Sequence, residues 1–147
     1  DVEPPNNPRS WDHCLIVVET GGMRIVHWGD NRHNPPDDIW QALGHIDMAL
    51  LPVDASQHVM GHIHVQAIVD RLQPRIVVPH HYYIWDVVQR QSTLQTCDDW
   101  VNEHEVVERI AGSKRIYRIE EMDKLEAAVH YFGDNVAFDK EAWMAGT

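Results

Sequence analysis

The sequence predicts an α/β domain in which helices pack against a β-sheet. Helical spacing of apolar residues runs from Met60 to Leu72, and Pro74 then stops the helix. Strands that alternate with helices are typical of a sheet covered by helices. Short apolar runs rich in β-branched residues, as expected of strands, occur at residues 13–19, 24–28, 48–52 and 75–79. We therefore expect these four strands in one sheet, with helix 61–72 on one of its faces.

Turn and capping residues predict the remaining elements. Gly21-Gly22 between the first two strands indicates a hairpin. Pro and acidic residues at its start and Gly at its end predict a short helix within Pro35–Gly44. We further expect a helix over residues 97–110, a final strand at 115–119 and a weakly helical stretch from Met122 to Tyr131. In this division residues 1–12 are a loop or linker, 13–119 form the domain, and 120–147 are a C-terminal extension.

Composition narrows the functional classes. The 147 residues suit one domain, and 12 Lys and Arg against 23 Asp and Glu give a net charge of -11. Such a surface repels phosphates, so we expect no nucleic-acid partner. The chain contains no run of eighteen apolar residues and no basic, apolar start, so we expect no membrane span and no signal peptide. Only Cys14 and Cys97 are present, which favours reduced thiols and a cytoplasmic location.

The first candidate for chemistry is Asp30, at the end of His27-Trp28-Gly29-Asp30. Glycine lets the backbone turn sharply where the strand ends, so the carboxylate projects from the edge of the sheet. A carboxylate in that place can bridge two cations. The alternative is that Asp30 caps a turn, and for an isolated Gly-Asp this is the commoner role.

The second candidate is the histidine pair at the end of Val77-Val78-Pro79-His80-His81-Tyr82. Imidazole is a ligand for zinc, iron and related ions. Adjacent residues of a strand face opposite ways, so at most one of His80 and His81 is expected to be a ligand.

The order of these pieces resembles the metallo-β-lactamase superfamily. Three segments carry the resemblance, in this order along the chain: Cys14–Asp30, which ends in Gly-Asp; Ile46–Val53, which ends in Leu-Pro-Val; and Leu72–Tyr82, which ends in Arg-Ile-Val-Val-Pro-His-His-Tyr. The likeness covers roughly residues 10–119 and is greatest to the branch that contains the ascorbate-phosphate lactonase. It implies the C-terminal half of an αββα sandwich.

The same resemblance assigns roles to site residues. Asp30 matches the bridging carboxylate of a two-metal site and His81 the last histidine ligand, whereas His80 falls on the variable position before it. Tyr82 is implied to orient substrate or a water molecule. The resemblance also implies two metal ions, zinc first, with manganese or iron as alternatives.

One departure from the family pattern limits these expectations. The signature His-x-His-x-Asp-His does not occur in the chain, which therefore supplies at most two of the family's ligands. A catalytic zinc normally keeps three protein ligands. His58 shares the i, i+4 spacing of a helical metal pair with His62, so His58 and His80 are candidates for the border of the site, although a solvated helix start is the alternative for this histidine group.

Two functions remain open at this point. The first is a metal-dependent hydrolase acting on a small-molecule ester, lactone or phosphodiester, inactive as this isolated half. The second is a half-domain or remnant without catalysis that self-associates or binds a partner. In both cases a half-sheet exposes an apolar face, so we expect a homodimer or a preceding half of the same domain to cover it.

Overall fold

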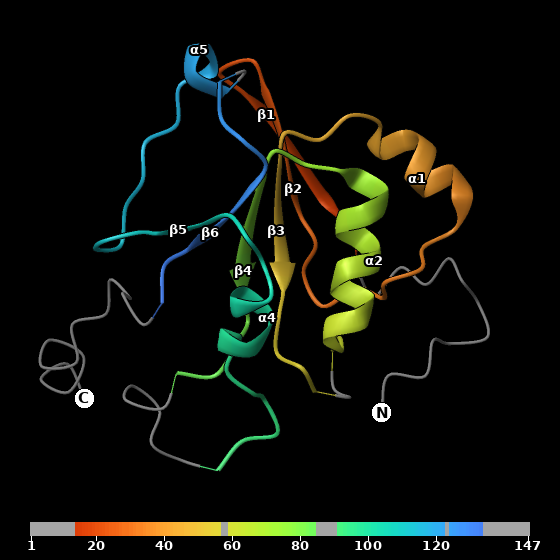
Figure 1. The fold of residues 1–147 in the computed structure, drawn as a ribbon. Coiled ribbons are helices and arrows are strands. Elements are labelled where there is room, and N and C mark those ends of the chain that lie inside the picture. The colour runs from red at the N-terminus through yellow and green to blue at the C-terminus, as the bar shows by residue number, and fades with distance from the viewer. Residues whose placement is uncertain (1–13, 57–58, 85–90, 123, 134–147) are drawn as a thin grey trace, which may run out of the picture.

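The computed structural model describes residues 14–56, 59–84, 91–122 and 124–133. These residues form a six-stranded sheet with strand order β1-β2-β3-β4-β6-β5 (Figure 1). β1 is antiparallel to β2, and every other neighbouring pair is parallel. The strands are β1 (Ile16–Thr20), β2 (Met23–His27), β3 (Met48–Pro52), β4 (Ile76–His80), β5 (Val107–Arg109) and β6 (Ala128–Tyr131); the helices are α1 (Asp37–Leu43), α2 (His62–Leu72), α4 (Asp98–Asn102) and α5 (Ile119–Met122).

The predicted hairpin is formed by β1 and β2. Gly21 and Gly22 connect them with φ angles of 58° and 80°. Two consecutive positive φ values are the mark of the tight hairpin turn whose twist matches that of the strands, and glycine adopts them without steric cost. The turn sets Thr20 opposite Met23 and so fixes the register of the whole pair.

The main core lies between the sheet and α2. Val26, Leu51 and Val77 project from three neighbouring strands and pack in one buried cluster with Val65 and Ile68 of the helix. Full burial of such a side chain contributes roughly 1.5–3 kcal/mol each, so this layer is the main source of stability. The predictions that the four strands share one sheet and that helix 61–72 covers one face are confirmed. No described helix is long and apolar enough to cross a membrane.

The opposite face of the sheet is only partly covered. At its amino end Met48 and Ile76 pack against Met122 of α5. Farther along, Ile16 and Val18 of β1 remain 52% and 47% exposed. Val18 lies opposite Ile25, and Ile16 lies opposite His27. Residues directly opposite each other in an antiparallel pair share a face of the sheet. Within the part of the chain that the structure describes, an apolar strip on this face therefore stays open to solvent.

Arg24 and Asp47 tie the end of α1 to the sheet. The Arg24 guanidinium donates hydrogen bonds to the carbonyls of Leu43 and His45, 3.0 Å from each. The Asp47 carboxylate in turn accepts from the Arg24 backbone N–H at 2.7 Å and lies 2.9 Å from His45 Nε2. This network holds the turn before β3 and thereby sets where β3 starts beside β2.

Three predictions for the second half of the chain are wrong. The helix expected over 97–110 ends at Asn102, because residues 107–109 pair with β6 as strand β5. The strand expected at 115–119 is absent: α5 begins at Ile119, and residues 114–118 form no regular element. The weakly helical stretch 122–131 ends instead in β6, which pairs with β4 and β5. In the first and third cases pairing between distant segments overrides local propensity, whereas residues 115–118 find no strand partner.

The Arg24–Asp47 network can be tested by removing its carboxylate. Asp47→Ala leaves the Arg24 N–H without its acceptor, and we expect it to lower the free energy of unfolding by about 1–3 kcal/mol. Burial raises the pKa of Asp47, but the Arg24 N–H bond and the contact with His45 outweigh it and set the pKa below 3.8. A carboxyl group whose pKa falls on folding stabilises the protein above its unfolded pKa, so the difference should shrink as pH falls below 3.8.

Denaturant titrations at neutral and acid pH measure this difference. Asp37→Ala is the matched control, because the Asp37 side chain is 84% exposed in its ion pair with Arg71 and such pairs contribute less than about 1 kcal/mol. Equal losses for the two variants at neutral pH would contradict the proposed role of Asp47.

Candidate functional site

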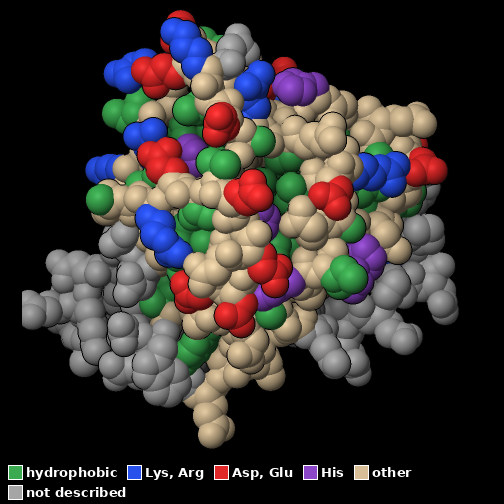
Figure 2. All heavy atoms as spheres, viewed as in Figure 1, with side chains coloured by type: hydrophobic (Ala, Val, Ile, Leu, Met, Phe, Trp, Pro, Cys, Tyr) green, Lys and Arg blue, Asp and Glu red, His purple; other side chains and the backbone are tan. Residues whose placement is uncertain are grey.

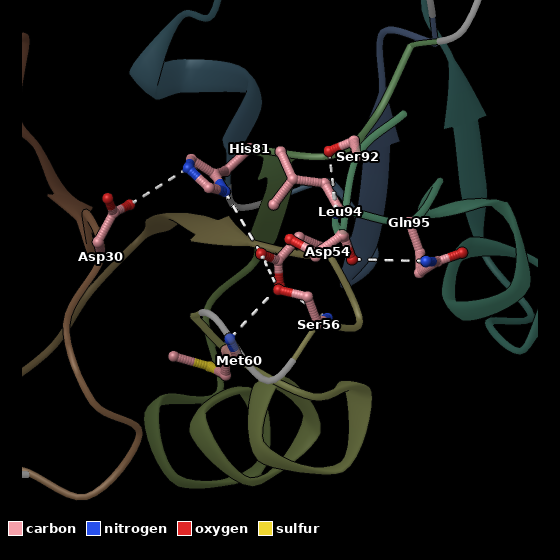
Figure 3. Close-up of polar contacts among 9 residues, drawn as sticks. Asp30, Asp54, Ser56, Met60, His81, Ser92, Leu94 and Gln95 are labelled. Atoms are coloured by element: carbon pink, nitrogen blue, oxygen red, sulfur yellow. Dashed lines mark hydrogen bonds and ion pairs between the residues drawn. The ribbon is translucent and has the colours of Figure 1, made fainter. Parts of the chain in front are cut away.

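Three loops meet where parallel strands β2, β3 and β4 end. The pairing sets the ends of these strands at one edge of the sheet, where Pro52 lies opposite His80. The hydrogen bond from Val53 N–H to the His80 carbonyl extends that pairing by one step. Asp30, Asp54 and His81 follow the three strands and point toward one another (Figure 3). Clustering of polar side chains at the carboxyl ends of parallel strands is the common arrangement of sites in α/β proteins.

Asp30 is placed by the turn that ends β2. Trp28 is fully buried, and its N–H still pairs with the Leu50 carbonyl, so the strand is fixed up to that residue. Gly29 then reverses direction at φ 60°, and the Asn31 side chain donates to the Trp28 carbonyl. The Asp30 side chain remains 51% exposed at the edge of the sheet. It is thus both fixed in position and accessible to a ligand.

His81 stands between two carboxylates. Its Nε2 lies 3.7 Å from Asp30 Oδ1, and its Nδ1 lies 3.5 Å from Asp54 Oδ2. The residue has φ 59°, in the left-handed region that non-glycine residues rarely adopt, and this backbone conformation turns the ring into the site. The predicted approach of Asp30 and His81 is therefore confirmed, whereas their role as metal ligands stays a prediction.

Asp54 belongs to the same group, and sequence reasoning missed it. Its side chain is completely buried. The carboxylate accepts hydrogen bonds from Ser56 N–H, from the Ser56 hydroxyl at 2.8 Å and from Met60 N–H. The available signal was position, because Asp54 follows the apolar strand Met48–Pro52 at the carboxyl edge.

His80 borders the site from the uncovered face of the sheet. Its ring stacks on that of His27, with centroids 4.7 Å apart. Burial, aided by the neighbouring His27 and His81, lowers the pKa of His80 to about 4, so the ring is neutral near pH 7. Its Nε2 is buried and has no hydrogen-bond partner among the described residues. His80 is therefore a neutral imidazole with one nitrogen left for a ligand.

Tyr82 is held by contacts with the end of β6 and the residues that follow it. The Tyr82 hydroxyl donates to the Gly133 carbonyl, and its ring packs 5.8 Å from that of Tyr131. These contacts anchor the segment that follows His81. The proposed role of Tyr82 in orienting substrate stays a prediction. His58 lies outside the described residues.

The donor set fits part of a metal centre. Ligand atoms lie about 2.0–2.2 Å from zinc, so two donors of one ion are roughly 3–4 Å apart, and Asp30 Oδ1 and His81 Nε2 at 3.7 Å meet that condition. Within the described ranges, however, no group of three or more His, Cys, Asp or Glu side chains is arranged to hold an ion. The chain thus presents two matching donors and needs at least one more.

Fold and site together define an α/β domain with a candidate metal centre at the carboxyl edge of its sheet. The family described as "Beta-lactamase superfamily domain" matches residues 3–81, more than half of the chain, and the chain belongs to that family. A solved structure from Thermotoga maritima, described as that of a candidate Zn-dependent hydrolase of the metallo-β-lactamase superfamily, superposes with a TM-score of 0.63. The two chains are 23% identical, and the superposed region covers 80% of this chain and 57% of the Thermotoga maritima chain.

Curated relatives are similar over a shorter stretch. A UPF0173 metal-dependent hydrolase of Thermococcus onnurineus is 38% identical over 73 residues, which are 49% of this chain and 32% of that protein. One from Methanosarcina mazei is 34% identical over 75 residues, 51% and 32% of the two chains. The matched segments thus span about a third of the length of these relatives.

The turn that places Asp30 yields a prediction. Gly29→Ala forces a Cβ into φ 60°, and the new atom would lie 3.5 Å from Asn31 Nδ2, in ordinary contact. The strain is therefore one of backbone conformation, and we expect a loss of about 1 kcal/mol in the free energy of unfolding. Gly29→Asn is the matched control, because asparagine adopts a positive φ more readily than alanine and should therefore lose less stability at the same position. Denaturant titration of both variants checks this, and equal effects would contradict it.

Proposed function

We propose that this chain is part of a metal-dependent hydrolase that acts on an ester, a lactone or a phosphodiester. The observation that carries the proposal is the 3.7 Å approach of Asp30 Oδ1 to His81 Nε2 at the carboxyl edge of the sheet. Membership of the β-lactamase superfamily supports it, as do relatives that are described as metal-dependent hydrolases. Asp30 and His81 lie on different loops, and their convergence is what a shared ligand requires.

Each residue has a distinct task in this proposal. Asp30 and His81 would hold the metal, and by the family resemblance Asp30 would be the carboxylate shared between two ions. Zinc is our first choice, and manganese or iron are the alternatives. When bound, such a cation lowers the pKa of a water molecule to about 7 and stabilises negative charge that develops on the substrate. His80 offers its free Nε2 to the substrate at the border of the site, and Tyr82 holds the segment behind His81. The substrate is a small molecule of the lactone or ester type, as in the lactonase-like branch that the sequence resembles.

Completion of the site requires another part of the protein. We propose that the chain is the C-terminal half of a cytoplasmic αββα sandwich and that the preceding half supplies the missing ligands. That half would also cover the strip at Ile16 and Val18, on the face where His27 and His80 stack. A second copy of this chain could cover the same strip without adding the missing motif.

Ligand number leads to a direct prediction. The 147-residue chain should bind zinc weakly and hydrolyse nothing at a useful rate, because one carboxylate and one imidazole leave most coordination positions to water. A chain extended upstream should bind zinc stoichiometrically and be active. In the extended chain Asp30→Ala should lower both metal content and rate, whereas Asp37→Ala, on exposed α1, should change neither.

Elemental analysis after dialysis, with assays on a generic phosphodiester and a lactone, tests this prediction. Tight stoichiometric zinc in the short chain would mean that other histidines complete a site, most plainly His80 or His58. An extended chain that contains no metal and has no activity would overturn the hydrolase proposal.

The second candidate function is a half-domain that associates without catalysis, and the uncovered apolar strip is what favours it. We expect the short chain to dimerise through this strip, and Val18→Asp to yield monomers in sedimentation velocity. Ile63→Asp is the matched control: Ile63 is 78% exposed but lies on α2, away from the strip, so the dimer should persist. A monomeric parent chain would contradict self-association.

A further inference from the structure

We propose that Asp54 is a positioning residue: its buried carboxylate keeps the proton of neutral His81 on Nδ1 and so presents the Nε2 lone pair toward Asp30. This inference rests on the proposed function, because the nitrogen it directs is the one assigned to metal. It adds a residue that the sequence did not single out and an explanation for the orientation of His81.

The first support is the way in which Asp54 is held. Burying a carboxylate is costly unless hydrogen bonds satisfy its oxygens. Oδ1 accepts two backbone N–H groups, from Ser56 and Met60, and Oδ2 accepts the Ser56 hydroxyl. Oδ2 is also the atom that lies 3.5 Å from His81 Nδ1. The carboxylate is therefore immobilised with one oxygen directed at the ring.

The second support comes from His81. Its Nδ1 is buried and has no hydrogen-bond partner at ordinary distance among the described residues. At 3.5 Å the contact with Asp54 is longer than a hydrogen bond, and such bonds in ligand-free sites commonly shorten when the site is filled. A proton on Nδ1 is attracted by the carboxylate, whereas a lone pair there is repelled. Asp30 attracts a proton on Nε2 in the same way, but Asp30 is 51% exposed and 3.7 Å away, whereas Asp54 is fully buried and 3.5 Å away, so its attraction is the stronger. The proton therefore stays on Nδ1, and Nε2 faces Asp30 unprotonated, as a metal ligand must be.

The third support is the backbone that fixes the distance between the two loops. Ala55, directly after Asp54, has φ 50°, and His81 has φ 59°. Non-glycine residues in this region cost about 1–3 kcal/mol each and persist where surrounding structure enforces them. Gln95 supplies that enforcement. Its backbone N–H donates to the Asp54 carbonyl at 2.8 Å (Figure 3), and its backbone carbonyl accepts from Tyr83 N–H at 2.9 Å. Gln95 thus links the loop of Asp54 to the loop of His81.

Histidine tautomers can be read by NMR without metal or substrate. In long-range proton–nitrogen spectra of the metal-free chain, recorded above the pH at which the ring-nitrogen shifts of His81 stop changing, we expect protonated Nδ1 and unprotonated Nε2. Asp54→Asn should reverse this. The side-chain oxygen of the introduced asparagine can keep the two hydrogen bonds from backbone N–H groups. Its NH₂ group then faces His81 Nδ1. Because NH₂ is a hydrogen-bond donor, it favours an unprotonated Nδ1.

Ser56→Ala is the control, since it removes one hydrogen bond to Asp54 but leaves the carboxylate beside His81, and it should not change the tautomer. Zinc affinity of the extended chain, measured by chelator competition, should fall about ten- to a hundredfold in Asp54→Asn. The proposal is wrong if His81 of the parent chain is protonated on Nε2, a result that does not depend on how well the variant folds. It is also wrong if the parent and Asp54→Asn show the same tautomer. A reversed tautomer in an extended chain that binds no zinc would uphold the positioning role and reject the metal function instead.

Discussion

Parallel pairing of β3 with β2 and β4 is the constraint on which the rest of the structure depends. Parallel strands end at the same edge of a sheet, so three loops far apart in the sequence meet there. The same pairing requires crossovers, which α1 and α2 provide, and α2 in turn buries one face of the sheet. The site and the core are therefore two results of one topology.

The two faces of the sheet differ in how completely they are covered. On the α2 side, aliphatic residues of three strands are buried in one cluster with residues of the helix. On the other side, α5 covers only the amino end, and the carboxyl end carries the stacked His27 and His80 beside exposed Ile16. Polar rings next to apolar side chains suit an interface that encloses a site better than they suit open solvent. The uncovered strip and the two-donor site are therefore the two observations behind our proposal of a second structural half.

Local patterns predicted the first half of the fold well, because its elements are specified by nearby residues. Gly21-Gly22 dictates a hairpin, and Pro74 ends α2 after Gln73 adopts a left-handed conformation. Beyond Cys97 the outcome depends on distant pairing: residues 107–109 have helical spacing yet become a strand because β6 lies beside them. Propensity within a window carries no information on such partners, so both β5 and β6 were missed.

The candidate site shows the same division between local and distant information. Asp30 and His81 could be predicted because each follows a strand in a recognisable motif. Asp54 also follows a strand, but its importance lies in burial and in the direction of one carboxylate oxygen, which depend on Ser56, Met60 and Gln95. A side chain that binds a metal needs only to lie at the edge of the sheet. A side chain that orients such a metal ligand must itself be held by several contacts. Orienting residues are therefore found from the hydrogen bonds around them, and that is how the structure extends a two-residue motif to a site with a defined ring orientation.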